Sequence, residues 1–327
     1  MSRDDINDVK IFAGRASVGL SQGISEHLEL PLGEGRTDIF PDGELMVKLE
    51  EDVRGRDCFV VQSTYHPVNA HLMELLIYID CLRRASARQI TAVIPYYGYA
   101  RQDRKDEGRT PITAKLVANL ITTAGADRVV TMDLHAGQIQ GFFDIPVDHL
   151  TAAPVFVNYI ESIREELGDI VLVSPDTGNV KTATMYANLI GGELAIIDKR
   201  RKSGSEVVSA HIIGDVKGRT VLMFDDMIST AGTICSAARL VMDQGANDVL
   251  ALATHPVLVG LAMDRLEDAP ISRVVVADTI PCDQRCDRLG GRLTVLSVAH
   301  LLGQAIHRIH HHQSVSSLFS LGGTGKR

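Results

Sequence analysis

Short apolar runs alternate with amphipathic helical segments along almost the whole chain, and this alternation restricts the fold more than any other property of the sequence. Asp57–Ser63 is strand-forming, Asn69–Ala85 has leucine and isoleucine at helical spacing, and Gln89–Pro95 is apolar again. Apolar runs of this length are typical of strands buried on both faces, and such strands form parallel sheets covered by helices. The sequence therefore predicts an α/β protein with right-handed crossovers.

The same alternation returns in the second half of the chain, where Ile170–Ser174 is again strand-like. Two Gly-Ala pairs, at Gly125 and Gly245, stand 120 residues apart, and each lies between a helical segment and a strand that leads to a histidine. This internal similarity indicates a duplicated α/β domain. We expect an N-terminal domain over residues 1–150 and a C-terminal domain over residues 151–327.

Composition and charge narrow the class of protein further. The chain has 327 residues, 45% of them hydrophobic and 23% charged, which is typical of a globular protein with two domains. Its formal charge of −8 argues against a nucleic-acid-coating surface, although local basic clusters can still bind phosphate substrates. The sequence has no secretory signal or membrane-spanning apolar run, and its five scattered cysteines suit a reducing compartment. We expect a cytoplasmic protein that binds neither nucleic acid nor membrane.

The segment from Val221 to Thr233 carries the strongest chemical signal. Four apolar residues precede the acids Asp225 and Asp226, and a small, hydroxylated turn then leads into a helix. The turn consists of Ser229, Thr230, Ala231, Gly232 and Thr233. Small residues let the backbone close around an anion, and amide groups at a helix N-terminus favour phosphate. The carboxylates can accept hydrogen bonds from vicinal hydroxyls, so the pattern indicates a sugar diol beside a phosphate; the alternative is that the acids only cap a strand–turn–helix.

A basic and aromatic stretch follows another predicted strand. It contains Arg101 and Gln102, and it begins with tyrosines of which Tyr97 or Tyr99 could stack on a base. Arginine binds phosphate oxygens in a bidentate manner. Because ligands of open α/β sheets bind at the carboxyl ends of strands, we expect this stretch to contact a nucleotide.

His135 and Asp176 each follow a predicted strand as well. Together they could hold Mg²⁺, which takes few protein ligands while water and phosphate oxygens complete its shell. The cationic run Lys199–Lys202, on a predicted hairpin, could neutralise a polyphosphate. Taken alone, these features also fit a core histidine and a solvated basic hairpin. The cluster His307–His312 is interpreted as a helix-end surface rather than a metal site.

Together with Phe40-Pro41-Asp42-Gly43-Glu44, these motifs resemble the ribose-phosphate pyrophosphokinase family over nearly the whole chain, from about Lys10 to Phe319. The resemblance implies two tandem, duplicated domains of the type I phosphoribosyltransferase-like fold, each a mostly parallel sheet flanked by helices. The N-terminal domain would serve ATP, and the C-terminal domain would bind ribose 5-phosphate and carry a flexible catalytic loop. The implied reaction is diphosphoryl transfer from ATP to the 1-hydroxyl of ribose 5-phosphate, with Mg²⁺ as cofactor. A homo-oligomer, often a hexamer, and allosteric control by phosphate and ADP are also implied.

The resemblance further implies a role for each matching residue. It assigns catalysis to Lys199 and Arg201, ATP binding to Phe40, Asp42, Gly43, Glu44, Arg101 and Gln102, metal binding to His135 and Asp176, and ribose 5-phosphate binding to Arg201, Asp225, Asp226, Ser229, Thr230, Ala231, Gly232 and Thr233. The Asp42–Glu44 loop is expected to serve the adenine side of a neighbouring subunit.

Five positions depart from the family's habit, and two of them are Thr177 and Asn179, where small residues are common. Ser229 stands where aspartate is common, Pro41 replaces a common serine, and Lys202 replaces a common proline. We expect phosphate binding to survive at Ser229, because relatives that are transferases tolerate small residues there. Any effect of Pro41 and Lys202 would fall on loop dynamics or nucleotide affinity.

Two other functions stay open at this point. A phosphoribosyltransferase that consumes phosphoribosyl pyrophosphate would share the Asp225–Thr233 loop but would not need an ATP site. A non-catalytic homologue of the synthetase would be expected to lose a residue such as Lys199 or His135, and the sequence retains both.

Overall fold

The computed structural model describes residues 8–105, 107–203 and 206–318. These residues form two compact units. Unit 1 comprises the described residues of Met1–Thr151, Thr279–Pro281 and Ser297–Arg327, and unit 2 comprises Ala152–Asp278 and Cys282–Leu296. The chain thus leaves unit 1 near the predicted boundary but returns to it at its C-terminal end. The predicted contiguous domain over residues 151–327 therefore differs from the compact units, because helical periodicity does not reveal which unit the last helix packs against.

Unit 1 is built on a five-stranded sheet in which every described strand pair is parallel. In spatial order the strands are β1 (Val9–Ala13), β4 (Asp57–Val61), β5 (Gln89–Ile94), β6 (Arg128–Met132) and β7 (Val147–Leu150). All five residues of β4 are buried, as the apolar run predicts. Each strand joins the sheet beside the preceding one, so the order of these described strands does not reverse.

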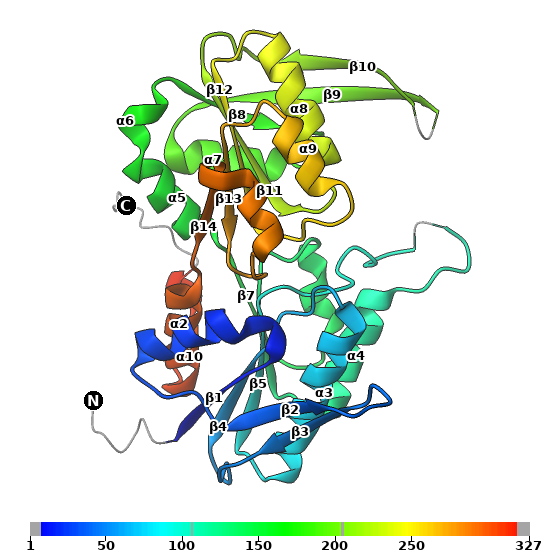
Figure 1. Ribbon diagram of the computed structural model, residues 1–327, viewed down its shortest axis with the longest axis vertical. Helices are drawn as coiled ribbons and strands as arrows, with labels where there is room; N and C mark the ends of the chain where they lie inside the picture. Colours follow the sequence, from blue (N-terminus) through cyan, green and yellow to red (C-terminus); the bar gives the residue numbers. More distant parts are fainter. Residues whose placement is uncertain (1–7, 106, 204–205, 319–327) are drawn as a thin grey trace. The chain divides into compact units, whose positions relative to one another are not determined.

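Helices cover both faces of this sheet (Figure 1). α3 (Val68–Arg84) and α4 (Thr113–Ala124) lie on one face, and α2 (Val18–Leu28) and α10 (Ala299–His310) lie on the other. The two helices of the second pair pack closely, because a Cβ atom on Gly23 would lie 2.9 Å from that of Ala299. An antiparallel hairpin that the sequence did not predict, β2 (Gly35–Ile39) with β3 (Leu45–Leu49), packs against α3. The short 3₁₀ helices of unit 1 are η1 (Arg15–Ser17), η2 (Gly137–Phe142) and η4 (Ser316–Leu318).

Unit 2 contains a seven-stranded sheet. In spatial order its strands are β10 (Glu206–Ile213), β9 (Glu193–Ser203), β8 (Ile170–Ser174), β11 (Thr220–Ile228), β12 (Asp248–Pro256), β13 (Arg273–Ala277) and β14 (Leu293–Leu296). Only the β9–β10 pair is antiparallel among these described strands. The chain adds β9 on one side of β8 and later adds β12 on the far side of β11. The strand order therefore reverses between β8 and β11.

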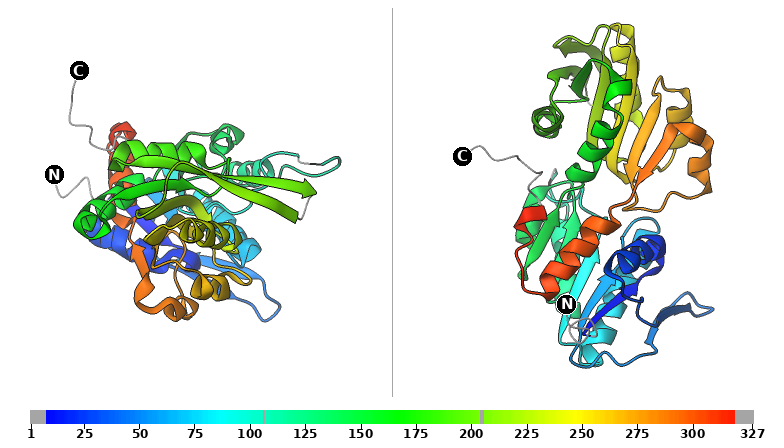
Figure 2. Two further views of the ribbon diagram at one scale, coloured as in Figure 1. Left: turned by 90° about the horizontal axis from the view of Figure 1, so that it is seen from above. Right: turned by 90° about the vertical axis from the view of Figure 1, so that its left-hand side faces the viewer.

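The helices of unit 2 also cover both faces of its sheet (Figures 1 and 2). α7 (Val180–Ile190), with α5 (Ala153–Ser162) against it, lies on one face, and α8 (Gly232–Asp243) and α9 (Ala262–Asp268) lie on the other. The remaining elements are α6 (Arg164–Leu167) and the 3₁₀ segment η3 (Gln284–Arg292). In the described parts of both units, no helix has the length and apolar character needed to cross a bilayer.

The predicted internal similarity is visible in the backbone. α4 ends at Gly125 with φ 117°, and α8 is followed by Gly245 with φ 90°. In both places the N–H of the next residue, an alanine, donates to a carbonyl five residues earlier, at Ile121 and Val241. Such left-handed endings favour glycine. The histidines that follow are less alike, because His255 is buried within β12 whereas the other lies beyond the end of its strand.

Candidate active site

The predicted phosphate loop lies where the strand order of unit 2 reverses. β8 and β11 pair only as far as Leu222 of β11, so their carboxyl ends part. β11 itself continues to Ile228 because β12 runs beside it as far as Pro256. Asp225 and Asp226 therefore lie within a strand, and the small, hydroxylated turn begins only after Ile228. Ligands of open α/β sheets bind where neighbouring strands diverge in this way.

Two other carboxylates act electrostatically on Asp225 at this point. Burial raises the pKa of Asp225 to about 8, and the charges of Asp226 and Asp176 add to the shift. The backbone N–H of Asp226 donates to Oδ1 of Asp225 over 2.9 Å. Carboxylates this close resist ionising together unless a cation or hydrogen-bond donors compensate them. The cluster is therefore suited to a ligand that supplies positive charge or hydroxyl groups.

Backbone hydrogen bonds hold Asp176 in the loop between β8 and α7. Its Oδ1 accepts from the N–H groups of Gly178, at 2.9 Å, and Asn179, at 3.1 Å. The side chain of Asn179 donates to the carbonyl of Phe224 over 2.6 Å and joins this loop to β11. Asn179 thereby helps to hold the two strand ends together, a role that the sequence does not predict.

The turn after β11 enters α8 through a left-handed residue. Ala231 has φ 58° and ψ 5°, and α8 begins at the next residue, Gly232. Ala231 is buried, Ser229 is half-buried, and Thr230 is exposed. A left-handed residue at such a turn directs successive backbone N–H groups towards a common point, which makes a concave site for an anion. The small, hydroxylated sequence predicts a tight turn that leads into a helix, and the structure has this turn.

The basic run lies on the hairpin of β9 and β10, as predicted, and this hairpin extends beyond the other strands of unit 2 (Figure 1). Lys199 is paired with Ala210 and Arg201 with Val207 in the antiparallel register. The side chains of residues 199–210 lie outside the described part of the structure. The catalytic roles of Lys199 and Arg201 therefore stay predictions.

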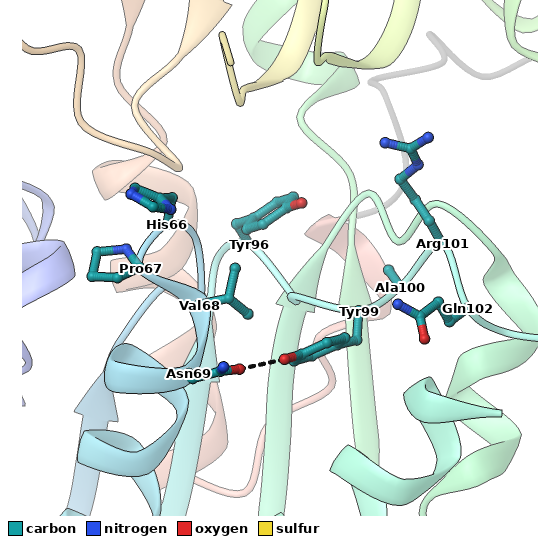
Figure 3. A pocket seen from close by; sticks show the side chains of 9 residues that line it. All are labelled: His66, Pro67, Val68, Asn69, Tyr96, Tyr99, Ala100, Arg101 and Gln102. Carbon is teal, nitrogen blue, oxygen red and sulfur yellow. Dashed lines mark hydrogen bonds between the residues drawn. The ribbon is translucent and has the colours of Figure 1, made fainter. Parts of the chain in front are cut away.

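Unit 1 has a pocket of about 690 Å³ beside the basic and aromatic stretch (Figure 3). Its lining consists of His66, Pro67, Val68, Asn69, Tyr96, Tyr99, Ala100, Arg101 and Gln102. Both residues predicted to bind ATP in this stretch, Arg101 and Gln102, are exposed to it. The hydroxyl of Tyr99 donates to Oδ1 of Asn69 (Figure 3). The volume and the mixed aromatic and polar lining are those of a small-molecule site.

The two tyrosines that could stack on a base differ in the structure. Tyr97 is buried, its hydroxyl donates to the carbonyl of Ala114 over 2.9 Å, and burial raises its pKa. The stacking interpretation is therefore wrong for Tyr97, which is a core residue. Tyr99 is half-buried in the pocket lining and has φ 64°. Such backbone costs a non-glycine residue about 1–2 kcal/mol, and strained residues of this kind often mark functional sites.

His135 lies three residues beyond the end of β6 and is exposed. Its loop is fastened to the basic and aromatic stretch, because Nε2 of Gln138 donates to Oδ2 of Asp103 over 2.5 Å. The N–H of Leu134 also donates to Nε2 of His149 over 2.8 Å. The structure thus brings the loop of His135 to the same side of unit 1 as the predicted ATP residues.

The Phe40–Glu44 loop is the turn of the β2–β3 hairpin. Gly43 has φ 94°, and the N–H of Glu44 donates to Oδ1 of Asp42 over 3.1 Å, so the predicted ligand Asp42 also shapes the turn. On β2, the hydroxyl of Thr37 donates to the buried carboxylate of Glu74 over 2.7 Å. This bond fastens the hairpin to α3. The side chain of Phe40 stays 44% exposed, which leaves a large apolar group available to a ligand.

The two predicted metal ligands belong to different units, His135 to unit 1 and Asp176 to unit 2. Over the residues that the structure describes, no three histidine, cysteine, aspartate or glutamate side chains are grouped so as to hold a metal ion. The interpretation of the histidine cluster as an open helix-end surface needs correction at His310. Its Nδ1 lies 2.8 Å from Oδ2 of Asp57, and its side chain is only 9% exposed.

Comparisons with known proteins agree over both halves of the chain. A family model described as the N-terminal domain of ribose phosphate pyrophosphokinase matches residues 9–125, and one described as the phosphoribosyl synthetase-associated domain matches residues 204–320. The ribose-phosphate pyrophosphokinase of Rhodopirellula baltica is 58% identical over 315 residues, which cover 96% of this chain and 99% of the relative. That of Caldanaerobacter subterraneus subsp. tengcongensis is 53% identical over 315 residues, with coverages of 96% and 98%.

A solved structure agrees with the sequence relatives. The crystal structure of phosphoribosylpyrophosphate synthetase from Mycobacterium smegmatis matches with a TM-score of 0.87 and 44% identity, over 93% of this chain and 99% of that one. The predicted fold class, two phosphoribosyltransferase-like α/β halves with mostly parallel sheets, is confirmed by this match and by the sheets of both units. The chain belongs to the ribose-phosphate pyrophosphokinase family.

Proposed function

We propose that this chain transfers the diphosphoryl group of ATP to the 1-hydroxyl of ribose 5-phosphate, giving 5-phosphoribosyl 1-pyrophosphate and AMP for nucleotide biosynthesis. The observation that carries the proposal is the 58% identity to a ribose-phosphate pyrophosphokinase over 96% of the chain. Two features of the units support it. Unit 2 has a carboxylate cluster beside a phosphate-type turn, and unit 1 has a pocket lined by Arg101 and Gln102.

The chemistry is an in-line displacement at phosphorus. The 1-hydroxyl oxygen forms a bond to the β-phosphorus of ATP, and the bond from that phosphorus to the α,β-bridging oxygen breaks. The bridging oxygen and its electron pair leave with AMP, and the hydroxyl proton is released. Negative charge grows on the oxygens around the bond that breaks, so cations aimed at them lower the barrier. We assign this role to Lys199 and Arg201 on the β9–β10 hairpin.

In unit 2, ribose 5-phosphate would bind across the end of β11. The ribose hydroxyls would donate to Asp225 and Asp226, which would offset the burial and the repulsion that together raise the pKa of Asp225. The 5-phosphate would accept hydrogen bonds from the turn at Ser229, Thr230, Ala231, Gly232 and Thr233. A serine at position 229 suits this arrangement, because the backbone N–H does not depend on the side chain.

In unit 1, ATP would bind beside Arg101 and Gln102. We assign its adenine side to Phe40, Asp42, Gly43 and Glu44, contributed by a neighbouring subunit as in the family resemblance. The site would then require a homo-oligomer, and we propose a hexamer that phosphate and ADP regulate. Light scattering coupled to gel filtration tests the assembly, since a monomer that is fully active would contradict it. The cytoplasmic location and the lack of a nucleic-acid partner stay predictions.

Mg²⁺ fits the donors that the chain offers. Asp176 contributes a carboxylate whose position is fixed by two backbone N–H groups, beside an acidic cluster that needs positive charge. His135 contributes an exposed imidazole in the loop that follows β6 of unit 1. These two residues would hold the ion. When bound, Mg²⁺ would neutralise charge on the polyphosphate of ATP.

The test combines ribose 5-phosphate, ATP and Mg²⁺ and measures AMP and 5-phosphoribosyl 1-pyrophosphate together. Equal amounts of both products are expected from the wild-type protein, with a large loss in Lys199→Ala and on chelation of Mg²⁺. A phosphoribosyltransferase would instead consume 5-phosphoribosyl 1-pyrophosphate without ATP, and a non-catalytic homologue would bind both substrates without forming AMP. Either pattern would overturn the proposal.

A further inference from the structure

The turn that follows β11 is held by the segment between β12 and α9. The N–H of Leu258 donates to the carbonyl of Ile228 over 2.9 Å, and the N–H of Val259 donates to the carbonyl of Ser229 over 3.0 Å. Nη1 of Arg265, on α9, donates to the carbonyl of Thr230 over 2.7 Å. Three successive carbonyl groups of the turn are therefore bound from one side.

This arrangement dictates where the amide groups of the turn point. In a planar trans peptide the C=O and the following N–H point in opposite directions. Because the carbonyls of residues 228, 229 and 230 face the β12–α9 segment, the N–H groups of Ser229, Thr230 and Ala231 face away from it. Three parallel donors just ahead of the N-terminus of α8 form the concave site that an anion requires.

Arg265 is the one side chain among these three donors, and its surroundings direct it to the turn. Two of the acids on α9, Asp264 and Glu267, are bound to Arg288 over 2.8 and 2.6 Å. Nη1 of Arg265 would lie 3.4 Å from a Cβ atom built on Gly232, so the guanidinium packs against the first turn of α8. The helix that carries it is anchored by buried Ala262, Met263 and Leu266.

We propose that Arg265 is a positioning residue for the ribose 5-phosphate site, which orients the peptide group between Thr230 and Ala231 so that its N–H faces the 5-phosphate. The inference rests on the proposed function of this turn. Arg265 acts through the backbone, and its hydrogen bond to the Thr230 carbonyl, rather than its charge alone, is the feature that matters.

Two substitutions of similar length separate the hydrogen bond from the charge. Arg265→Gln lacks the charge but keeps an N–H donor that can reach a carbonyl, whereas Arg265→Met has neither. For Arg265→Met we expect the KM for ribose 5-phosphate to rise about tenfold, with little change in kcat or in the KM for ATP. For Arg265→Gln the rise should be about threefold or less. The matched control is Arg219→Met, which removes surface ion pairs to Asp169 and Glu193 at the opposite end of β11.

Calorimetric titration with ribose 5-phosphate, without ATP, measures binding independently of turnover, and thermal unfolding checks that all variants are folded. If Arg265→Gln and Arg265→Met lose the same affinity for ribose 5-phosphate, the effect belongs to the charge and the inference is overturned. Wild-type affinity in both variants would also overturn it. If the wild-type protein binds ribose 5-phosphate but forms no AMP, the proposed reaction fails while this test still stands. If it does not bind ribose 5-phosphate, both proposals fail.

Discussion

The hydroxyl of Thr113, the first residue of α4, donates to the amide oxygen of Gln102 over 2.5 Å. With its oxygen held by α4, the amide of Gln102 presents its NH₂ group to the pocket of unit 1, as Figure 3 shows. We expect Thr113→Val, which keeps the shape and removes the hydroxyl, to raise the KM for ATP about threefold to tenfold, because a free amide can rotate. Steady-state kinetics measure this change.

The control for this prediction is Thr113→Ser, which keeps the hydroxyl and should stay close to the wild-type KM. The KM for ribose 5-phosphate should be unaffected in both variants. A KM for ATP that is the same in Thr113→Val and Thr113→Ser would refute an orienting role for the threonine.

The raised pKa of Asp225 makes stability depend on pH. Between the ordinary pKa of 3.8 and the folded-state value of about 8, the folded protein keeps a proton that the unfolded chain loses. Stability is therefore expected to fall as pH rises through this range. Asp225→Asn removes the ionisable group, so its unfolding midpoint relative to that of the wild type should rise by about 4 °C between pH 5 and pH 8.5. Differential scanning calorimetry without ligands measures both midpoints.

The matched control is Asp243→Asn, which alters an exposed carboxylate at the end of α8. Its midpoint relative to the wild type should not change with pH over this range. If the difference for Asp225→Asn is also constant from pH 5 to 8.5, Asp225 is not the group that holds the proton.

Two arginine–aspartate pairs of unit 1 should differ in their effect on stability. Arg88 and Asp57 lie 2.8 Å apart, and the aspartate side chain is 4% exposed; Arg84 and Asp80 lie 2.7 Å apart on an exposed helix face. Burial alone would raise the pKa of Asp57, but hydrogen bonds from Arg88 and His310 outweigh it and lower the pKa. We expect Arg88→Met to destabilise the protein by about 2 kcal/mol at pH 7, and Arg84→Met by no more than about 0.5 kcal/mol.

The stability contributed by the Arg88–Asp57 pair should also depend on pH, which gives a second measurement of its importance. A lowered carboxylate pKa contributes stability above the ordinary value, and that contribution is lost as pH falls through the folded-state pKa. The gap in unfolding midpoint between the wild type and Arg88→Met should therefore narrow towards pH 3. Equal midpoints for the two arginine variants at pH 7 would contradict the importance of burial.

Gly98 is expected to be essential to the pocket of unit 1. A Cβ atom at this position would lie 2.4 Å from the carbonyl oxygen of Thr64, whose hydroxyl accepts a hydrogen bond from the Gly98 N–H over 2.7 Å. Gly98→Ala must displace one backbone segment, so we expect a loss of about 1–3 kcal/mol and at least a tenfold rise in the KM for ATP. Gly19→Ala is the control, because a Cβ there meets nothing within 4 Å; it should leave both quantities near wild type. A fully active Gly98→Ala protein would show that the segment is free to shift.

Local periodicity was sufficient to predict most of the sheets, because strands buried on both faces are continuous apolar runs. β8 has the predicted bounds, whereas β11 continues past Phe224 because β12 provides backbone partners for residues that look like a loop. The β2–β3 hairpin was missed because its half-exposed residues include charged side chains such as Arg36 and Lys48. A pattern along one segment cannot reveal a partner that lies far away in the sequence.

The candidate site likewise combines residues that the sequence predicts with residues that it does not. The resemblance predicts which residues would touch ligands, and the structure places Asp176 near Asp225 and the loop of His135 beside the Arg101 segment. The supporting residues Thr113 and Arg265 gave no signal, because an ordinary threonine or surface arginine has meaning only through the group it orients. Tyr97 was misjudged because an aromatic residue in a polar stretch can still face the core.

The packing of α10 against α2 has a consequence for the order in which the molecule is completed. α2 presents His27 to the ring of His300, with centroids 4.2 Å apart, and Gly23 to Ala299. A ribosome makes α2 before unit 2 and makes α10 after every strand of unit 2. Unit 1 therefore begins first but is completed second, because one face of α2 stays uncovered until α10 has been made after all the strands of unit 2.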